Sequence, residues 1–233
     1  MCFSAGASFA AGAVLSVVGI TAIKQSRTSL QTAFAGIPLI FAVQQITEGF
    51  VWHSLLTPAH GPWQLPATYI FLLFAEVFWP VWVPFSILLL ENNKGRRKIL
   101  YALSGIGLLI SCYLGYRLAT QNVNAQIAGM HIAYSVGVPG KLVHYSAILY
   151  FIATAAAPFI SSVKKMWLFG VAIIISYIVT HIFFEDYELS VWCFFAAVMS
   201  AAVFIIILDL KKSFAVDADK SPGPVGKAIH PFY

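Results

Sequence analysis

Apolar runs separated by short polar breaks make up most of this chain. Each of the seven runs is about 20 residues long, enough for an α-helix to cross a bilayer hydrocarbon core about 30 Å thick. The pattern predicts an all-α fold, in which residues 1–212 form one polytopic membrane domain, a seven-transmembrane-helix bundle. The helices are expected at residues 4–23, 32–56, 67–90, 99–118, 142–160, 166–184 and 189–210.

The polar breaks differ in character. Residues 57–66 are rich in Pro and Gly and predict a loop. Residues 119–141 are too polar to cross a membrane and predict an external loop, in which residues 127–138 alternate enough to permit a short hairpin. Residues 213–233 predict a flexible cytoplasmic tail. No basic residue precedes the first apolar run, so we expect a retained helix there instead of a cleaved signal peptide.

The basic residues predict the orientation, because Lys and Arg near helix ends are retained on the cytoplasmic side. An outside N-terminus places every Lys and Arg on that side except Arg117 and Lys141. The acidic residues Glu185, Asp186 and Glu188 then lie outside. We therefore predict an outside N-terminus, a cytoplasmic C-terminus and a multi-pass protein of a bacterial-type inner membrane or a plasma membrane.

Composition favours a membrane protein over a soluble one. Hydrophobic residues make up 60% of the chain and charged residues 10%, whereas soluble domains have about 45–50% apolar and about 25% charged residues. The formal net charge of +5 does not indicate nucleic acid, because the basic residues follow the helix ends. The lipid bilayer is the expected partner, and the pattern leaves the oligomeric state open.

Two carboxylates interrupt the apolar runs, Glu48 and Glu76. A charge inside the hydrocarbon region costs about 2.5–3.5 kcal/mol unless it is paired, protonated or hydrated. Gln45, Glu48 and Trp52 are spaced i, i+3 and i+7, so they share one helical face. Two interpretations stay open: the acids border a functional cavity, or they are protonated and bond to neighbouring helices.

Most of the unusual polar side chains fall in the middle or outer half of the predicted bundle, which predicts a polar cavity there. Pro80 and Pro84 free backbone carbonyls and kink the third helix, and such kinks often border cavities in membrane bundles. The candidate cavity residues are Gln45, Glu48, Trp52, Glu76, Trp79, Tyr113, His144, Tyr145, His181 and Trp192.

Histidines and cysteines suggest two further features near the outer side. His181 and Glu185 are four residues apart on one helical face, and His144 lies at a similar depth. Imidazole and carboxylate groups suit zinc, although interfacial histidines also bond to water or to neighbours. Cys2 and Cys193 both lie near the outer surface, where they form either a disulfide or two free thiols.

Four segments together resemble one family of uncharacterised microbial integral membrane proteins that begin with a similar Met-Cys-Phe-Ser stretch. They are residues 1–5 (MCFSA), 44–49 (QQITEG), 78–84 (FWPVWVP) and 191–197 (VWCFFAA). The resemblance spans all seven predicted helices. It implies a shared site that involves Cys2, Glu48, Trp79 and Trp192, but it brings no activity.

Three functions stay open. The first is a protein that binds or transports a small or amphipathic ligand in the cavity. The second is an intramembrane lipid hydrolase similar to alkaline ceramidases, with zinc held by His144, His181 and Glu185 or Glu48, although the seventh helix lacks the histidine of that pattern. The third is a subunit of a membrane complex. Apart from zinc, no cofactor is indicated, and retinal is disfavoured because the seventh helix has no lysine within the membrane.

Overall fold

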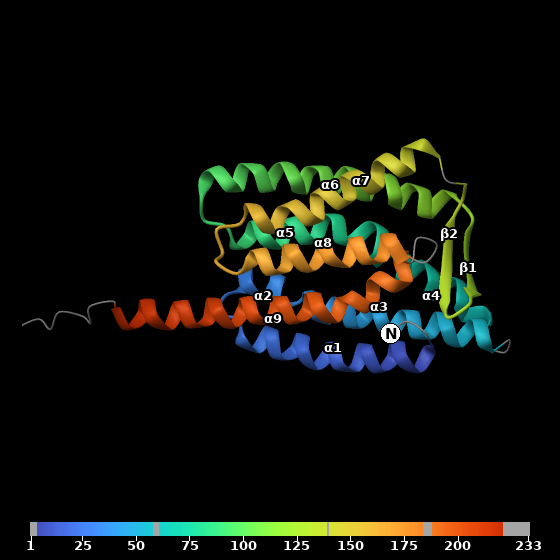
Figure 1. Cartoon of the computed structure of the whole chain (residues 1–233), viewed down its shortest axis with the longest axis horizontal. Coiled ribbons are helices and arrows are strands. Elements are labelled where there is room, and N and C mark those ends of the chain that lie inside the picture. The colour runs from blue at the N-terminus through green and yellow to red at the C-terminus, as the bar shows by residue number, and fades with distance from the viewer. Residues whose placement is uncertain (1–3, 58–60, 139, 184–187, 221–233) are drawn as a thin grey trace, which may run out of the picture.

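Helices that run back and forth along one direction form nearly the whole structure (Figure 1), which confirms the all-α prediction. This computed structural model describes the backbone of residues 4–57, 61–138, 140–183 and 188–220, and their side chains except at 141, 183, 188–194 and 214–220. The elements are α1 (Ala5–Gln25), α2 (Ser29–Ala35), α3 (Ile37–Leu56), α4 (Gly61–Leu72), the π-helix η2 (Leu73–Phe78), α5 (Trp79–Leu90), α6 (Lys94–Thr120), β1 (Val123–Ala128), β2 (His131–Val136), α7 (Lys141–Ile160), α8 (Met166–Phe183) and α9 (Glu188–Lys220).

Within the described residues, five helical segments are long and apolar enough to cross a membrane. These segments are Ala5–Gln25, Ser29–Leu56, Gly61–Leu90, Lys94–Thr120 and Leu142–Ile160. A shorter apolar helix covers Met166–Ile182. The chain is therefore helical and membrane-like.

The second and third predicted helices are subdivided. A break at Gly36 separates α2 from α3, where Pro38 occupies the first turn, a position that tolerates its missing N–H. The third segment begins at Gly61, so the loop predicted at residues 57–66 is shorter than expected and Pro66 lies inside α4. Pro62 explains the early start, because proline is favoured at the beginning of a helix.

Two helices, α6 and α9, extend further than the sequence predicted. The α6 helix begins at Lys94, because the side chain of Asn93 accepts bonds from the backbone N–H groups of Gly95 at 2.9 Å and Arg96 at 3.1 Å. Lys94, Arg96, Arg97 and Lys98 therefore lie in the first turns of a helix and not in the connection before it. The α9 helix continues to Lys220, into the segment predicted as a flexible tail, and residues 221–233 lie outside the described residues.

The α1 and α3 helices pack against each other along small residues. A Cβ added at Gly12 would lie 2.6 Å from the Ile46 side chain, and one at Gly19 would lie 2.6 Å from the backbone nitrogen of Leu39. Small residues at such positions let helix backbones approach closely. Within a bilayer the hydrophobic effect does not drive helices together, so van der Waals packing of this kind stabilises their association. Aromatic packing fills the centre, where Phe34 and Phe169 meet edge to face at 5.5 Å.

One end of the bundle carries the antiparallel hairpin of β1 and β2, beside the start of α1 and the last turn of α6 (Figure 1). We call it the hairpin end. Its register pairs Val123 with Val136, so the hairpin begins earlier than the alternation at residues 127–138 indicated. The turn uses Gly129 at a φ of 62°, a conformation that suits glycine.

The opposite end, which we call the basic end, holds the α1–α2, α5–α6 and α7–α8 connections and the last turns of α9 (Figure 1). Lys165 and Asp209 form an ion pair there at 2.8 Å, and Lys211 Nζ donates to Gln25 Oε1. The basic residues whose side chains are described at this end are Lys24, Arg27, Lys94, Arg96, Arg97, Lys98, Lys164, Lys165, Lys211 and Lys212.

Candidate functional site

The π-helix η2 creates an opening in the hydrogen-bond ladder of the third segment. A π-helix pairs each carbonyl with the N–H five residues later, and for Ala75 that residue is Pro80, which has no N–H. Tyr150 of α7 fills the gap, because its hydroxyl donates to the Ala75 carbonyl at 2.8 Å. Ser111 of α6 likewise donates to the Val77 carbonyl at 2.5 Å. The irregular turn is thus held by side chains from two neighbouring helices.

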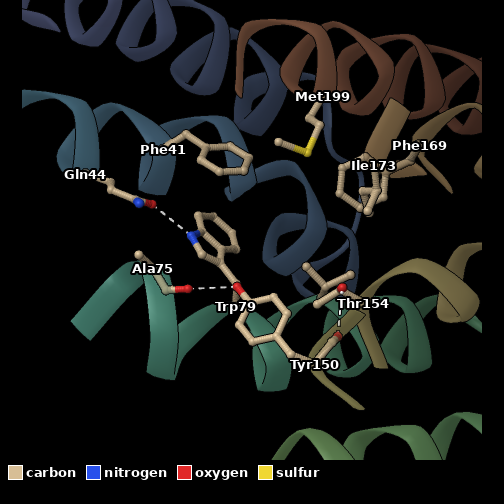
Figure 2. A pocket seen from close by; sticks show the side chains of 10 residues that line it. Phe41, Gln44, Ala75, Trp79, Tyr150, Thr154, Phe169, Ile173 and Met199 are labelled. Atoms are coloured by element: carbon tan, nitrogen blue, oxygen red, sulfur yellow. Dashed lines mark hydrogen bonds between the residues drawn. The ribbon is translucent and has the colours of Figure 1, made fainter. Parts of the chain in front are cut away.

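A first cavity of about 50 Å³ lies beside this turn (Figure 2). Trp79 crosses it: its indole Nε1 donates to Gln44 Oε1 at 2.8 Å, and its ring stacks on Phe41 with centroids 4.1 Å apart. Thr154 Oγ1 donates to the Tyr150 carbonyl at 3.0 Å. Since these polar groups already have partners in the protein, the first cavity presents a mainly apolar surface. The remaining lining residues are Ala75, Val83, Phe169, Ile173 and Met199.

A second cavity of about 150 Å³ lies on the other side of Tyr150, toward the hairpin end. Glu76 and Arg117 line it, and Arg117 acts electrostatically on Glu76. Glu76 Oε2 is buried and has no hydrogen-bond partner among the residues that the structure describes. Arg117 Nη2 donates to the Val136 carbonyl of β2. The other lining residues are Ala75, Leu114, Val143, Ser146, Ala147, Tyr150, Phe151 and Tyr177.

The two cavities share the walls Ala75 and Tyr150. The bond between the Tyr150 hydroxyl and the Ala75 carbonyl therefore spans the partition between them. Tyr150 is only 9% exposed. The second cavity holds both charged groups, so the arrangement offers an acceptor from Glu76 and donors from Arg117 to a small polar group.

Of the predicted cluster on α3, Gln45 and Glu48 contact each other, and none of Gln45, Glu48 and Trp52 lines either cavity. Gln45 and Glu48 are fully buried, and Gln45 Nε2 donates to Glu48 Oε2 at 3.4 Å. Trp52 is 4% exposed, and its Nε1 has no hydrogen-bond partner in the described part of the chain. Of the predicted cavity residues, the structure thus brings Trp79 to the first cavity and Glu76 to the second.

The other predicted cavity residues lie apart. His144 and Tyr145 are exposed on α7, and Tyr113 is half-buried against the core. His181 is exposed, but its ring stacks on that of Tyr177, with centroids 5.7 Å apart. Tyr177 lines the second cavity, so His181 contacts a wall of that cavity without lining it. The side chain of Trp192 lies outside the described residues.

The metal and disulfide predictions are untested. No group of three or more His, Cys, Asp or Glu side chains converges among the described residues, but Glu185 is not one of them. His144 and His181 are both exposed. Cys2 and the side chain of Cys193 also lie outside the described residues. Zinc held by His144, His181 and Glu185, and a bond between the two cysteines, stay predictions.

The sequence has a known family context. The model of DUF6629, a family of unknown function, matches residues 1–219. The chain belongs to this family. No curated protein and no solved structure matches it. Membership confirms the resemblance to an uncharacterised family and assigns no activity, so the function of this DUF6629 member has to be argued from its own site.

Four polar residues of the second cavity were not selected from the sequence: Arg117, Ser146, Tyr150 and Tyr177. Arg117 did leave a signal, since it is one of only two basic residues outside the cytoplasmic segments of the predicted topology. Tyr150 had a weaker one, in the prolines that remove donors from the third segment. Only packing identifies the helix that supplies the missing donor.

Proposed function

We propose that this DUF6629 member is a seven-helix integral membrane protein, with its N-terminus outside, that binds a small polar ligand in the Glu76–Arg117 cavity. Five membrane-length segments support the first part, and α8 and α9 complete the count. The gathering of the basic residues at one end of the bundle supports the orientation, because Lys and Arg are retained on the cytoplasmic side. The hairpin end is then the outer end.

The buried Glu76 oxygen is the observation that carries the binding proposal. A buried acceptor without a partner costs about 1–3 kcal/mol, and more when it is charged. Glu76 Oε2 is such an atom among the described residues. It borders a cavity large enough to hold a small molecule that donates a hydrogen bond to it. A bound ligand with an N–H or O–H group would remove this cost.

Arg117 and the cavity size narrow the ligand class. The guanidinium offers donors to an acceptor group, so the ligand carries both a donor and an acceptor, as a small zwitterion does. A cavity of about 150 Å³ is the size that accommodates benzene. The ligand therefore has about six non-hydrogen atoms or fewer. The cavity lies near the hairpin end, which is the outer end in the proposed orientation, and this position favours entry of the ligand from outside.

Glu76→Gln is the direct test of binding. Purified protein is titrated with glycine, urea, methylammonium and acetate, and stabilisation is followed by thermal unfolding. We expect glycine to bind best and Glu76→Gln to weaken it about 10- to 100-fold, because hydrogen bonds to charged groups contribute about 1.5–3 kcal/mol.

The matched control for that titration is Glu91→Gln, an acid-to-amide change at the basic end. It should lower stability and leave glycine affinity unchanged. If none of the four probes stabilises the protein, or if Glu76→Gln binds glycine as well as the parent does, the ligand-binding proposal fails.

Thiol labelling tests the orientation separately. With the three native cysteines replaced by serine, Asn124→Cys on the hairpin and Asn92→Cys at the basic end are both exposed positions. We expect a membrane-impermeant maleimide to label residue 124 in intact cells and residue 92 only after permeabilisation. The reverse pattern would mean an inside N-terminus, and equal labelling of both in intact cells would rule out the bundle's opposite ends as the two membrane faces.

A further inference from the structure

An apolar groove of about 370 Å³ lies between α8 and α9, on the outer surface of the bundle. Leu168, Val171 and Ile175 line it from α8, and Val198, Ala201 and Ile205 line it from α9. Ile175 and Val198 are each 51% exposed, so the groove opens away from the protein core. Its polar lining residue Ser176 donates its hydroxyl to the Ala172 carbonyl at 2.6 Å, which leaves an apolar surface.

The groove has the length of one bilayer leaflet. At 1.5 Å per residue, the lining covers roughly 12 Å along α8 and roughly 15 Å along α9. Half of a hydrocarbon core of about 30 Å is about 15 Å. The groove therefore fits one acyl chain of the leaflet on the side of the basic end.

Lysines continue both walls of the groove at the basic end. Lys164 lies in the turn just before α8, four residues before Leu168, and Lys212 lies on α9 seven residues after Ile205, on the same helical face as that groove residue. Both lysines are exposed. The Lys165–Asp209 ion pair at 2.8 Å joins the turn before α8 to α9 and neutralises a third lysine.

An aromatic side chain marks the depth at which the groove ends. Trp167, in the first turn of α8, is 52% exposed. Exposed tryptophans at helix ends favour the headgroup level of a membrane. Lys164 and Lys212, which form no ion pair among the described side chains, belong to this same end and therefore lie at the level of a lipid headgroup.

We propose that this groove is a binding site for an anionic phospholipid, whose acyl chain lies between α8 and α9 and whose phosphate meets Lys164 and Lys212. Basic pockets between helices on the cytoplasmic side bind anionic headgroups by the same chemistry. A second copy of the chain fits the groove less well. If it packed parallel across this face, it would bring its own lysines to the same level and like charges would face each other. The proposal goes beyond the ligand of the Glu76–Arg117 cavity and requires only that the bundle crosses a membrane.

Lipid titration of the full-length protein in neutral detergent tests the proposal, with native mass spectrometry as the measurement. The probes are phosphatidylglycerol and phosphatidylcholine with identical acyl chains. We expect phosphatidylglycerol to bind more tightly, and the double variant Lys164→Gln/Lys212→Gln to weaken it roughly 10- to 30-fold, because each lysine near the surface contributes about 1 kcal/mol. Phosphatidylcholine binding should hardly change.

The matched control is Lys94→Gln/Lys98→Gln, which removes two exposed lysines of the same end from α6, outside the groove. It should retain the preference for phosphatidylglycerol. Ala201→Leu narrows the groove and should weaken both lipids. Equal affinity of the parent for both lipids would overturn the proposal, as would an equal loss in the control. A parent dimer that Ala201→Leu dissociates would assign the groove to a second copy instead.

Discussion

Gly107→Ala is expected to force α5 and α6 apart and to lower the free energy of unfolding by about 3 kcal/mol or more. A Cβ at this position would lie 1.9 Å from the carbonyl oxygen of Pro80 and 2.7 Å from its carbonyl carbon. Both are backbone atoms, so no side-chain rotation relieves the overlap. The substitution therefore has to displace a helix.

The close approach has a local cause. The Pro80 carbonyl would pair with the N–H of residue 84 in an α-helix, but residue 84 is also proline. The bare Cα of Gly107 packs against that carbonyl and permits a weak Cα–H···O contact. Because a kinked, donor-poor helix needs a neighbour without a side chain, the Pro80, Pro84 and Gly107 positions act as one unit.

Gly105→Ala is the matched control, since it lies on the same helix two residues away. A Cβ there meets nothing within 4 Å. We expect it to be neutral or to stabilise by up to about 1 kcal/mol, as alanine is the better helix former. Thermal or denaturant unfolding in one detergent compares the two variants. Equal unfolding midpoints for Gly105→Ala and Gly107→Ala would show that the α5–α6 contact tolerates a methyl group.

Glu91→Gln is expected to destabilise the basic end, by about 2–4 kcal/mol. Glu91 is fully buried. Its Oε2 accepts from the Ser162 N–H at 2.6 Å, and its Oε1 accepts from the Ser162 hydroxyl at 2.7 Å and from the Asn93 N–H at 2.8 Å. An amide would turn an N–H donor toward one of these donors, so at least one bond is lost and a buried group is left unpaired.

The comparison variant for Glu91→Gln is Asp209→Asn, another acid-to-amide change at the same end. Its partner Lys165 is 40% exposed and Asp209 is 22% exposed, so solvent screens the pair. We expect a change within about 1 kcal/mol, as is usual for exposed ion pairs. A loss for Asp209→Asn as large as that for Glu91→Gln would contradict the special role of the buried carboxylate.

Lowering the pH should remove the stabilisation that the ionised Glu91 carboxylate provides. Burial alone would raise the pKa of this carboxyl, but the bonds from Ser162 and Asn93 outweigh burial and hold the pKa below its ordinary value of 4.5. The stabilisation is therefore fully present above about pH 4.5 and is lost as the pH falls from there through the lower pKa of the folded protein. Unfolding midpoints measured between pH 6 and pH 3 should fall less steeply for Glu91→Gln than for the parent.

Glu48 and Glu76 illustrate how far the sequence can lead. Both were identified as carboxylates inside apolar runs, where a charge is costly. The i, i+3 spacing correctly placed Gln45 and Glu48 on one helical face, where they form a hydrogen bond. The spacing could not show that Glu48 lines neither cavity whereas Glu76 borders the second one, beside Arg117. The π-helix adds one residue to a turn and so rotates the flanking faces by roughly 100°, which periodicity at 3.6 residues does not detect.

Glu91 shows the opposite case. In the sequence it is one polar residue at the end of an apolar run, and nothing distinguishes it from Asn92 or Asn93. In the structure it joins the α5–α6 connection to Ser162, 71 residues later. Contacts over such a separation depend on which helix ends meet, and no local pattern records them.

The sequence by itself determined the membrane-like, all-α character and the positions of the basic residues between the apolar segments. These properties depend on the composition of single segments of about 20 residues and their ends, because the bilayer acts on each segment separately. Only the tertiary structure decided which acid faces a cavity, which tyrosine replaces the donor missing at Pro80 and which glycine admits a carbonyl. Those outcomes depend on the rotation and separation of packed helices, and packing sets both for the bundle as a whole.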